Sequence, residues 1–367
     1  MSRRFRMTTA LDVDDVLLEC VPYAIKLANE KYNFDPPLTI YEIDRWGKLG
    51  TRADVIFEFF TEEFFKTQPV IAGAKEFVRK LSQMTEVFIC TSVYPQFMSI
   101  RAEMIMKEFP EIPPENIYMA SRKDKLNVDI LLDDGMHNVM KSNAAYPILM
   151  RRPWNQSATG MLAVNNYDEF IKLVEVISSS YSMNREDIKN PSVVALVGPS
   201  GSGKSDIAKF LLESEPKFEK LLSYTTIDPT AKTENDWYNY IDKNEFFKML
   251  ENDELFESTM YAGHGFGSKK SDVDTIIGSG KTVLTIMDIC GAMSLKTHYK
   301  DVVTVYIKRD KRDLLTSILE KNSTNEDKVN RIISIDDERR NEEICDFVIE
   351  NDGDYKTSAK KIIDLLF

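Results

Sequence analysis

The chain has 367 residues, of which 43% are hydrophobic and 29% are charged. This composition is typical of a soluble globular protein, and it excludes collagen-like, disordered and disulfide-scaffold classes. The length suits two or three domains rather than a single core. The net charge of -12 at pH 7 makes the chain as a whole repel phosphate backbones, so stable nucleic-acid binding is not expected.

The cysteines and the hydropathy of the chain bear on its compartment. The four cysteines lie far apart without a Cys-x-x-Cys pair, as is usual for reduced thiols, and with three histidines they do not suggest a zinc site. The basic N-terminus lacks the apolar stretch of a secretory signal, and no run approaches the length of a membrane span. We therefore expect a cytoplasmic protein without a membrane partner; a homo-oligomer stays open.

The first half of the chain alternates short apolar runs with amphipathic helical stretches. Strands are expected at 9–12, 86–90, 129–133 and 147–150, with helices at 72–84 and 98–109. This alternation predicts an α/β domain with a parallel sheet covered by helices. Residues 20–70 interrupt it directly after the first strand, and their helical, aromatic-rich sequence suits a small cap standing over a site.

A polar, serine-rich linker over 181–192 separates this pattern from a second one. The second pattern opens with apolar runs at 193–197, 283–287 and 302–307. We therefore predict two α/β domains, the first over 1–180 and the second over 193–367.

Carboxylates gather where two of the predicted strands end. Asp12, Asp14 and Asp15 follow the first strand, and Asp133 and Asp134 end the third. Open α/β sheets bind ligands at the carboxyl ends of their strands. Crowded carboxylates repel one another unless a cation neutralises them, and a set of oxygen ligands suits Mg²⁺. The pattern indicates a magnesium site, although each Asp run taken alone also suits a turn or a helix cap.

Hydroxyl and ammonium groups stand near the same strand ends. Thr91 and Ser92 end the second strand, and Lys123 and Lys125 precede the third. In such a set a carboxylate can attack phosphorus and form an aspartyl-phosphate, which water hydrolyses. A second carboxylate two residues on can protonate the leaving alcohol, while hydroxyl and ammonium groups hold the phosphoryl oxygens. The combination indicates hydrolysis of a phosphate ester.

The order of these motifs over 8–180 resembles the haloacid dehalogenase superfamily of phosphohydrolases. The runs at 88–92 and 131–134 are most similar to its 5'(3')-deoxyribonucleotidase branch. The resemblance implies a Rossmann-like parallel sheet with a small helical cap. It also implies that Asp12 is the nucleophile and that Asp14 is the general acid and base.

Further site residues follow from the same resemblance. Thr91 and Ser92 would hold phosphate. Magnesium would bind to Asp12, the Asp14 backbone carbonyl and one or both of Asp133 and Asp134.

Two positions leave questions open. Spacing to the Asp pair favours Lys123 as the motif lysine, whereas the local Asp-Lys context favours Lys125. The family commonly has glycine where this chain has Asp15, which concerns the geometry of the loop rather than the chemistry. In the cap, Trp46 and Phe57 are candidates for stacking on a base, and the alternative for any one aromatic there is the core of the cap.

The second pattern begins with a phosphate-binding loop. Its first strand runs into a segment that fits G-x-x-x-x-G-K-[ST], formed by Gly198, Pro199, Ser200, Gly201, Ser202, Gly203, Lys204 and Ser205. Glycines let backbone N–H groups surround the phosphates, and the following helix adds its positive N-terminus. Lys204 would reach the outer phosphates and Ser205 would be placed for Mg²⁺, so we expect ATP as the phosphoryl donor.

Five ordered motifs follow this loop, and together they resemble guanylate kinase over essentially all of 193–367. They lie at 223–226, 237–240, 254–257, 266–268 and 286–292. The resemblance implies that the base is read by Ser223, Glu257, Ser268 and Asp288, and that Tyr238 touches the acceptor phosphate. Carboxylates suit the N–H donors of guanine, and a hydroxyl suits its O6.

This part of the chain also departs from the family. Both arginines of the T-T-R-x-P-R run are replaced over 225–230, and the phosphate-facing tyrosine is Phe266. An arginine fork binds phosphate more strongly than one neutral hydrogen bond, so GMP binding should suffer. Three possibilities stay open: substitution by Lys232, Lys269 or Lys270, a different acceptor, or a weak site.

Two more cations are candidates for the lid of the kinase half. Lys321 and Arg331 would place charge over the transferring phosphoryl group, and the alternative for both is a solvated helix face.

Both halves thus point to nucleoside monophosphates as substrates. The sequence predicts a magnesium-dependent 5'-nucleotidase joined to an ATP-dependent kinase of (d)GMP or a related purine nucleotide. One alternative is repair of polynucleotide ends by a 5'-kinase and 3'-phosphatase. Another is an active phosphatase fused to a guanylate kinase-like binding module with weak or no catalysis.

Overall fold

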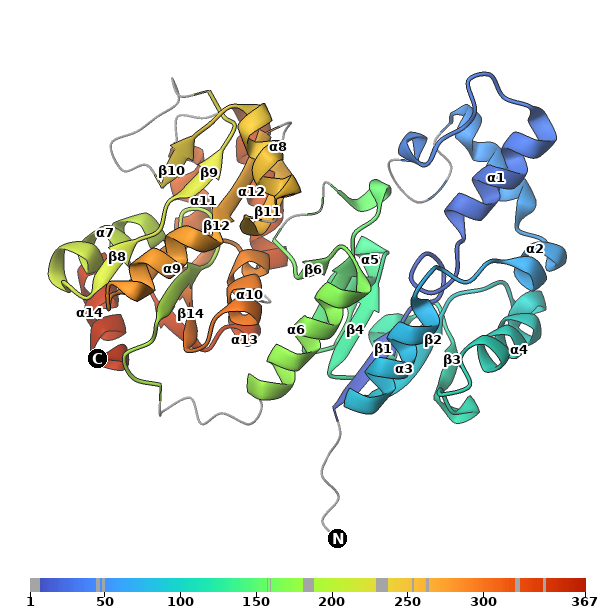
Figure 1. The fold of residues 1–367 in the computed structure, drawn as a ribbon, viewed down its shortest axis with the longest axis horizontal. Coiled ribbons are helices and arrows are strands. Elements are labelled where there is room, and N and C mark those ends of the chain that lie inside the picture. The colour runs from blue at the N-terminus through green and yellow to red at the C-terminus, as the bar shows by residue number, and fades with distance from the viewer. Residues whose placement is uncertain are drawn as a thin grey trace, which may run out of the picture. The chain divides into compact units, whose positions relative to one another are not determined.

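The computed structural model describes residues 7–43, 47, 50–156, 158, 160–180, 188–228, 237–252, 254–261, 264–320, 324–338 and 341–367. The chain forms two compact units (Figure 1). The first comprises Met1–Ala158 and Leu162–Ser178, and the second comprises Thr159–Met161 and Ser179–Phe367. Within the described part of the chain, no helix has the length and hydrophobicity that crossing a bilayer requires.

The first unit is built on a six-stranded parallel sheet in the order β3-β2-β1-β4-β5-β6. The strands are β1 (Thr8–Leu11), β2 (Glu86–Thr91), β3 (Ile117–Met119), β4 (Ile130–Asp133), β5 (Tyr146–Met150) and β6 (Ala163–Val164). The helices outside the cap are α3 (Ala74–Met84), α4 (Met98–Glu108), α5 (Met136–Lys141) and α6 (Tyr167–Ser180). The parallel sheet, its four predicted strands and the helices α3 and α4 are confirmed, whereas the short edge strands β3 and β6 were not predicted.

The register of the sheet explains why the site forms where it does. Strand β1 pairs with both β2 and β4, and Leu11 lies opposite Ile89 on one side and Leu132 on the other. The residues that follow these three positions therefore reach the same edge of the sheet. That edge carries Asp12 and Asp133.

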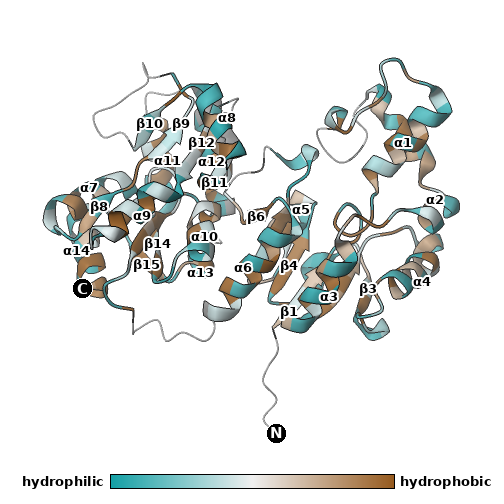
Figure 2. Cartoon of the chain, viewed as in Figure 1, coloured by the Kyte–Doolittle hydropathy of each residue, from teal (hydrophilic) through white to brown (hydrophobic). Residues whose placement is uncertain are grey.

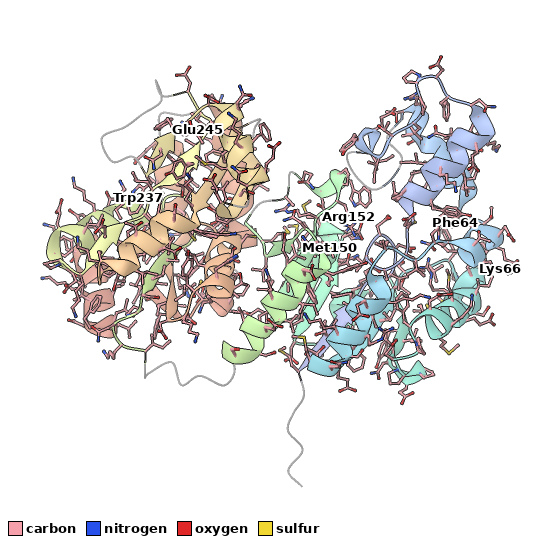
Figure 3. The ribbon with its side chains drawn as sticks, viewed as in Figure 1. Phe64, Lys66, Met150, Arg152, Trp237 and Glu245 are labelled. Carbon is pink, nitrogen blue, oxygen red and sulfur yellow. The ribbon has the colours of Figure 1, made fainter. Side chains whose placement is uncertain are left out.

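The described residues between 20 and 70 are largely helical, as expected. This segment holds α1 (Val21–Tyr32), α2 (Glu62–Thr67) and short 3-10 helices at Ile40–Glu42 and Arg52–Phe59. Its helices bury some side chains in a core of their own and expose others to solvent. Phe64 is buried whereas Lys66, two residues on, is exposed (Figure 3). Most aromatic side chains of this segment pack against a buried cluster that includes Phe64 and Phe65.

The second unit combines a five-stranded parallel sheet, β15-β14-β7-β13-β8, with a four-stranded mixed sheet, β10-β9-β12-β11. The strands are β7 (Val193–Val197), β8 (Phe218–Lys220), β9 (Ser223–Thr225), β10 (Tyr238–Tyr240), β11 (Leu255–Tyr261), β12 (His264–Lys269), β13 (Thr282–Ile286), β14 (Val302–Lys308) and β15 (Phe347–Glu350). The helices are α7 (Lys204–Ser214), α8 (Lys243–Glu251), α9 (Lys270–Gly278), α10 (Ile289–His298), α11 (Lys311–Glu320), α12 (Asn325–Glu338), α13 (Asn341–Ile344) and α14 (Tyr355–Leu366). The three strands predicted for this half are confirmed as β7, β13 and β14.

Both units bury their central strands. All five residues of β7 and all four of β4 are buried. Figure 2 shows hydrophobic residues concentrated in sheet strands such as β4 and β14, while the surrounding helices carry hydrophilic residues as well. Fully buried parallel strands position the loops at their carboxyl ends rigidly, and both candidate sites are built from such loops.

Candidate active sites

Three carboxylates and one ammonium group meet at the carboxyl edge of the first sheet. Ligand oxygens of Asp12, Asp133 and Asp134 lie within 4.8 Å of one another. The Lys123 Nζ lies 2.7 Å from Asp12 Oδ1 and 2.6 Å from Asp133 Oδ2, and the Lys123 side chain is only 2% exposed. An ammonium group shared by two buried carboxylates is held firmly, so this cluster has a defined geometry.

A second layer of donors, which sequence reasoning missed, orients the carboxylates. The Gly135 N–H and Asn138 Nδ2 donate to Asp133 Oδ1 at 2.8 and 3.1 Å. Trp154 Nε1 donates to Asp134 Oδ2 at 2.9 Å. Asn138 stands five residues after Asp133, and this spacing indicates the contact only once the position of α5 is known.

The balance of charge in the cluster is negative. Burial raises the pKa of Asp12 to about 7; Lys123 opposes this shift and Asp133 adds to it. Burial also raises the pKa of Asp134 well above its ordinary value, and repulsion from Asp12 and Asp133 adds to the shift. For Lys123, burial lowers the pKa, but attraction to the two carboxylates outweighs it and raises the pKa. A divalent cation would offset the excess negative charge of the carboxylates, and a donor set made only of oxygens suits Mg²⁺.

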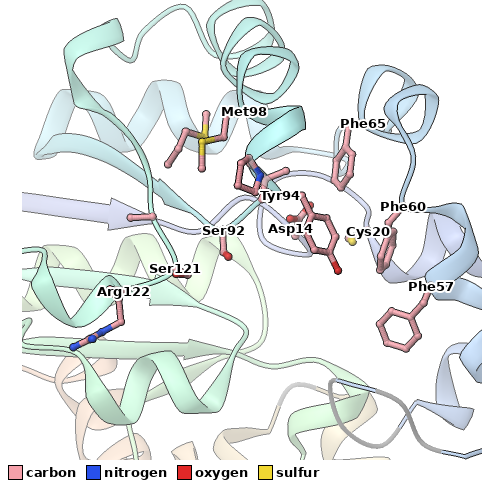
Figure 4. A pocket seen from close by; sticks show the side chains of 14 residues that line it. Asp14, Cys20, Phe57, Phe60, Phe65, Ser92, Tyr94, Met98, Ser121 and Arg122 are labelled. Atoms are coloured by element: carbon pink, nitrogen blue, oxygen red, sulfur yellow. The ribbon is translucent and has the colours of Figure 1, made fainter.

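Asp14 faces a different part of the site. It lines a cavity of about 610 Å³ together with Ser92 (Figure 4). The cap side of this cavity is aromatic, with Phe57, Phe60 and Phe65. Phe57 therefore lies where a base could stack, whereas Trp46 falls outside the described residues. Thr91 is fully buried at the end of β2, and its Oγ1 has no hydrogen-bond partner among the described residues.

The structure explains how the loop accommodates Asp15 at a position where the family resemblance leads us to expect glycine. Its φ is 55°, in the left-handed region where Asp is tolerated better than most residues. Its Oδ1 accepts hydrogen bonds from the backbone N–H groups of Cys20 at 2.9 Å and Val21 at 3.2 Å. Because these groups open α1, Asp15 satisfies donors that a helix start leaves unpaired. The loop keeps its conformation without glycine, and the side chain binds the first cap helix.

The structure brings Lys123 to the carboxylates and leaves Lys125 outside. The Lys125 side chain is largely exposed and lies 3.3 Å from Asp124. We expect Lys123→Ala to lower kcat/KM for phosphate release at least about a hundredfold, because the ammonium group would no longer hold the carboxylates or the phosphoryl oxygens. The matched variant Lys125→Ala should stay within about twofold of the wild type, as exposed pairs contribute little.

Release of orthophosphate from a nucleoside monophosphate measures both variants, and circular dichroism checks that each one folds. A larger loss in Lys125→Ala than in Lys123→Ala would contradict this placement.

The phosphate-binding loop follows β7 and opens α7. Gly198, Gly201 and Gly203 have φ values of 141°, 88° and 90°, which side chains rarely tolerate. At Gly203 a Cβ would lie 2.3 Å from Asn351 Nδ2. The Lys204 ammonium donates to the carbonyl oxygens of Gly198 and Pro199. Three positions of the loop thus have backbone conformations that glycine adopts readily and other residues rarely do.

Residues from distant parts of the second unit brace this loop. Asn351 Nδ2 donates to the Ser202 carbonyl at 2.7 Å, and Arg309 Nη1 donates to the Gly201 carbonyl at 2.8 Å. Neither brace was predicted. Arg331 Nη1 donates to Ser200 Oγ at 2.7 Å, so this predicted cation does lie at the loop. Lys321 falls outside the described residues, and Ser205 is exposed in the first turn of α7.

The residues expected to read the base lie together on the mixed sheet and α10. Ser223 Oγ and Ser268 Oγ share a hydrogen bond of 2.9 Å, and Ser268 Oγ lies 2.9 Å from Glu257 Oε1, to which it donates. Asp288 caps α10 by accepting from the Gly291 N–H at 2.8 Å. Burial raises the pKa of Glu257 to about 7, and the negative charge of Asp288 adds to it.

Two aromatic rings meet at the expected site of the acceptor phosphate. The Tyr238 and Phe266 rings meet edge to face, with centroids 5.8 Å apart. Lys269 forms an ion pair with Glu254 at 2.9 Å. Position 230 and Lys232 fall outside the described residues. Lys270, the other described candidate, begins α9.

The raised pKa of Glu257 has a consequence for stability. Its folded-state value of about 7 lies above its ordinary value of 4.5, so the folded state binds the proton more tightly than the unfolded state. Its ionisation therefore destabilises the fold progressively as pH rises from about 4.5 to 7, and the penalty is complete above that. We expect Glu257→Gln to raise the free energy of unfolding at pH 8 by on the order of 2 to 3 kcal/mol, and to change it little at pH 4.5.

Urea unfolding of the full chain at the two pH values measures this effect. The exposed Glu251→Gln, at the end of α8, is the matched control and should show no such pH dependence. An equal effect of Glu257→Gln at both pH values would contradict the assignment.

Comparison with known proteins matches each half separately. The family described as "5' nucleotidase, deoxy (Pyrimidine), cytosolic type C protein" matches residues 6–180, and the family "Guanylate kinase" matches residues 190–366. The "Guanylate kinase" of Rickettsia felis is 30% identical over 183 residues, which is 49% of this chain and 95% of that protein. The "5'(3')-deoxyribonucleotidase" of Bacillus subtilis is 27% identical over 164 residues, which is 44% of this chain and 94% of that protein.

Among solved structures, the guanylate kinase of Anaplasma phagocytophilum matches with 22% identity and a TM-score of 0.38. The match covers 48% of this chain and 86% of that one.

Proposed function

We propose that the chain is a bifunctional enzyme of nucleotide metabolism. It belongs to the guanylate kinase family over its C-terminal part, and its residues 6–180 match the family of cytosolic type C 5' nucleotidases. The first site would hydrolyse (deoxy)nucleoside 5'-monophosphates. The second would transfer the γ-phosphoryl group of ATP to (d)GMP or a related purine nucleotide. The observation that carries the proposal is the buried cluster of Asp12, Asp133 and Lys123, in one chain with an intact phosphate-binding loop at Lys204.

The hydrolysis proceeds in two steps. A carboxylate oxygen of Asp12 attacks phosphorus, the ester P–O bond breaks, and its electron pair passes to the leaving nucleoside oxygen, which takes a proton from Asp14. Water then attacks the aspartyl-phosphate, gives a proton to the Asp14 carboxylate, and releases orthophosphate with Asp12 restored. Lys123 stays bound to Asp12 and Asp133 and places a positive charge beside the phosphoryl group.

A magnesium ion would balance the negative charge of this site. Asp12, Asp133 and Asp134 would hold the ion, on the evidence of their oxygens within 4.8 Å. When bound, it screens the negative charges of the carboxylates and the substrate phosphate from one another.

In the second site, an oxygen of the acceptor phosphate attacks the γ-phosphorus of ATP, and the bond to ADP breaks. The loop from Gly198 to Ser205 would hold the triphosphate, and Lys204 would exchange the loop carbonyls for phosphate oxygens. Arg331, which donates to Ser200 of the loop, would add positive charge. Glu257 and Asp288 would accept from the N–H groups of guanine, with Ser223 and Ser268 beside them.

The two reactions would cancel if both acted on the same nucleotide. We therefore propose that the two sites prefer different nucleotides, so that the hydrolase dephosphorylates one mononucleotide while the kinase phosphorylates another. Weak binding of the acceptor phosphate is expected, since the arginine fork is missing.

A screen of all ribo- and deoxynucleoside monophosphates, with and without magnesium and ATP, tests this function. We expect orthophosphate from deoxynucleotides without ATP, and ADP formation that depends on a guanine nucleotide. Turnover of oligonucleotide 3'-phosphates but not of mononucleotides would favour polynucleotide end repair instead. ATP binding without phosphorylation of any nucleoside monophosphate would indicate that the second half is a binding module without catalysis.

A further inference from the structure

Two buried side chains from different elements bind the same oxygen of Asp14. Arg101 Nη2, from α4, donates to Asp14 Oδ1 at 2.8 Å. Gln68 Nε2, from the segment that follows α2, donates to the same oxygen, also at 2.8 Å. Because both donors occupy Oδ1, the carboxyl group is left with Oδ2 to present to the cavity that Asp14 lines.

Arg101 is an unusual residue to find in this place. Its side chain is 0% exposed, although arginine is almost never fully buried unless it is paired. Asp14 is the carboxylate with which it forms an ion pair, and its Nε and Nη1 groups have no hydrogen-bond partner among the described residues. A guanidinium buried at this cost, for one contact to one oxygen, indicates that the contact matters.

The same arginine touches the aromatic wall of the cavity. Its guanidinium lies 5.2 Å from the centroid of the Phe65 ring, and Phe65 lines the cavity beside Phe57 and Phe60. A side chain that stacks on one group and forms an ion pair with another fixes the position of the two groups relative to each other. Arg101 therefore connects the wall expected to contact the nucleoside with the carboxyl group expected to act on its leaving oxygen.

Gln68 makes a parallel connection through the backbone of the cap. It directly follows α2, the last helix of the cap, and its side chain is buried. The next residues return to the catalytic loop, where the Glu19 N–H donates to the Pro69 carbonyl at 2.8 Å and Leu18 pairs with Val70. These contacts hold the end of α2 and the Asp14 side chain in a fixed relative position.

We propose that Arg101 and Gln68 are positioning residues that fix Oδ2 of Asp14 at the leaving oxygen of the substrate, and so tie the acid step to contact of the nucleoside with the aromatic wall. This rests on the proposed hydrolase function. The step concerned is the transfer of the Asp14 proton to the leaving oxygen as that oxygen receives the electron pair of the breaking P–O bond. Neither residue gains or loses a proton or a bond to the substrate.

The dependence on the leaving group tests this role. A nucleoside alkoxide needs a proton to leave, whereas 4-nitrophenolate leaves without one. The ratio of kcat/KM between a deoxynucleoside 5'-monophosphate and 4-nitrophenyl phosphate therefore reports the acid step, because kcat/KM covers the steps up to the aspartyl-phosphate. Hydrolysis of that intermediate is common to both substrates and does not enter the ratio.

We expect Arg101→Met and Gln68→Met each to lower kcat/KM for the nucleotide about ten- to a hundredfold, and to change it for 4-nitrophenyl phosphate less than about threefold. Arg101→Lys, which keeps the charge without the fork, should recover part of the loss. Arg79→Met, on the exposed face of α3, is the matched control and should leave both values unchanged. Gln68→Met removes no charge, so it keeps the test intact where Arg101→Met weakens folding.

The outcomes separate the two levels of the proposal. Equal losses on both substrates in the variants at Arg101 and Gln68 would mean a merely structural role and would overturn the inference. A wild-type chain that hydrolyses neither substrate would overturn the proposed function, and the positioning role with it.

Discussion

Asp12→Asn is expected to abolish hydrolysis of nucleoside monophosphates, with kcat lowered at least about a thousandfold, and to leave the kinase reaction at its wild-type rate. An amide cannot form the aspartyl-phosphate, and the substitution also removes a charge that Lys123 and magnesium require. The side chain remains the same size, so the cluster with Asp133 should keep its packing. Orthophosphate release and ATP-dependent ADP release, measured on the same preparation, give the two rates.

The control for this prediction is Asp168→Asn, an exposed carboxylate in the first turn of α6. It should change neither rate. Loss of both activities in Asp12→Asn would contradict two independent sites, and full hydrolysis in that variant would contradict the nucleophile.

Lys204→Ala is expected to do the reverse. Its ammonium group donates to two carbonyl oxygens of the loop, and we expect it to bind the outer phosphates of ATP there. Removing it should lower the kinase rate by about a hundredfold or more, while hydrolysis continues. A coupled assay of ADP formation measures the loss.

The matched control is Lys209→Ala, which removes an exposed lysine from the same helix. It should retain kinase activity. If Lys204→Ala kept more than half of the wild-type kinase rate, the loop would not be the donor site.

The motifs of the first site could be predicted because parallel strands end at one edge of a sheet. That rule is enough to bring Asp12 and Asp133 together from positions 121 residues apart in the chain. It does not decide between Lys123 and Lys125, because one short 3-10 helix, Lys123–Lys125, determines which of the two faces the sheet. Such a turn has no periodic signal in the sequence.

Residues held by long-range contacts escaped prediction for a different reason. Arg101 lies on a helix that was predicted, but an arginine in an amphipathic helix is normally solvated, and only its tertiary partner Asp14 explains its burial. Asn351 and Arg309 brace a loop that lies more than a hundred residues before them. Pairings across such distances depend on the packing of whole elements.

The departure at Asp15 shows what local rules can and cannot foresee. A left-handed φ is compatible with Asp, which tolerates that region better than most residues do. The compensating hydrogen bonds to Cys20 and Val21 depend on where α1 begins. A helix in the cap was predicted, but its first residue was not.

Phosphorus NMR of a single sample, with the full chain, magnesium, ATP and a mixture of deoxynucleoside monophosphates, tests the central claim most directly. Two separate magnesium-dependent reactions in one polypeptide predict that orthophosphate grows at the expense of one mononucleotide, while a nucleoside diphosphate and ADP grow at the expense of another. If orthophosphate arose from ATP alone, or no nucleoside diphosphate of the acceptor formed, the chain would not be the two-site enzyme described above.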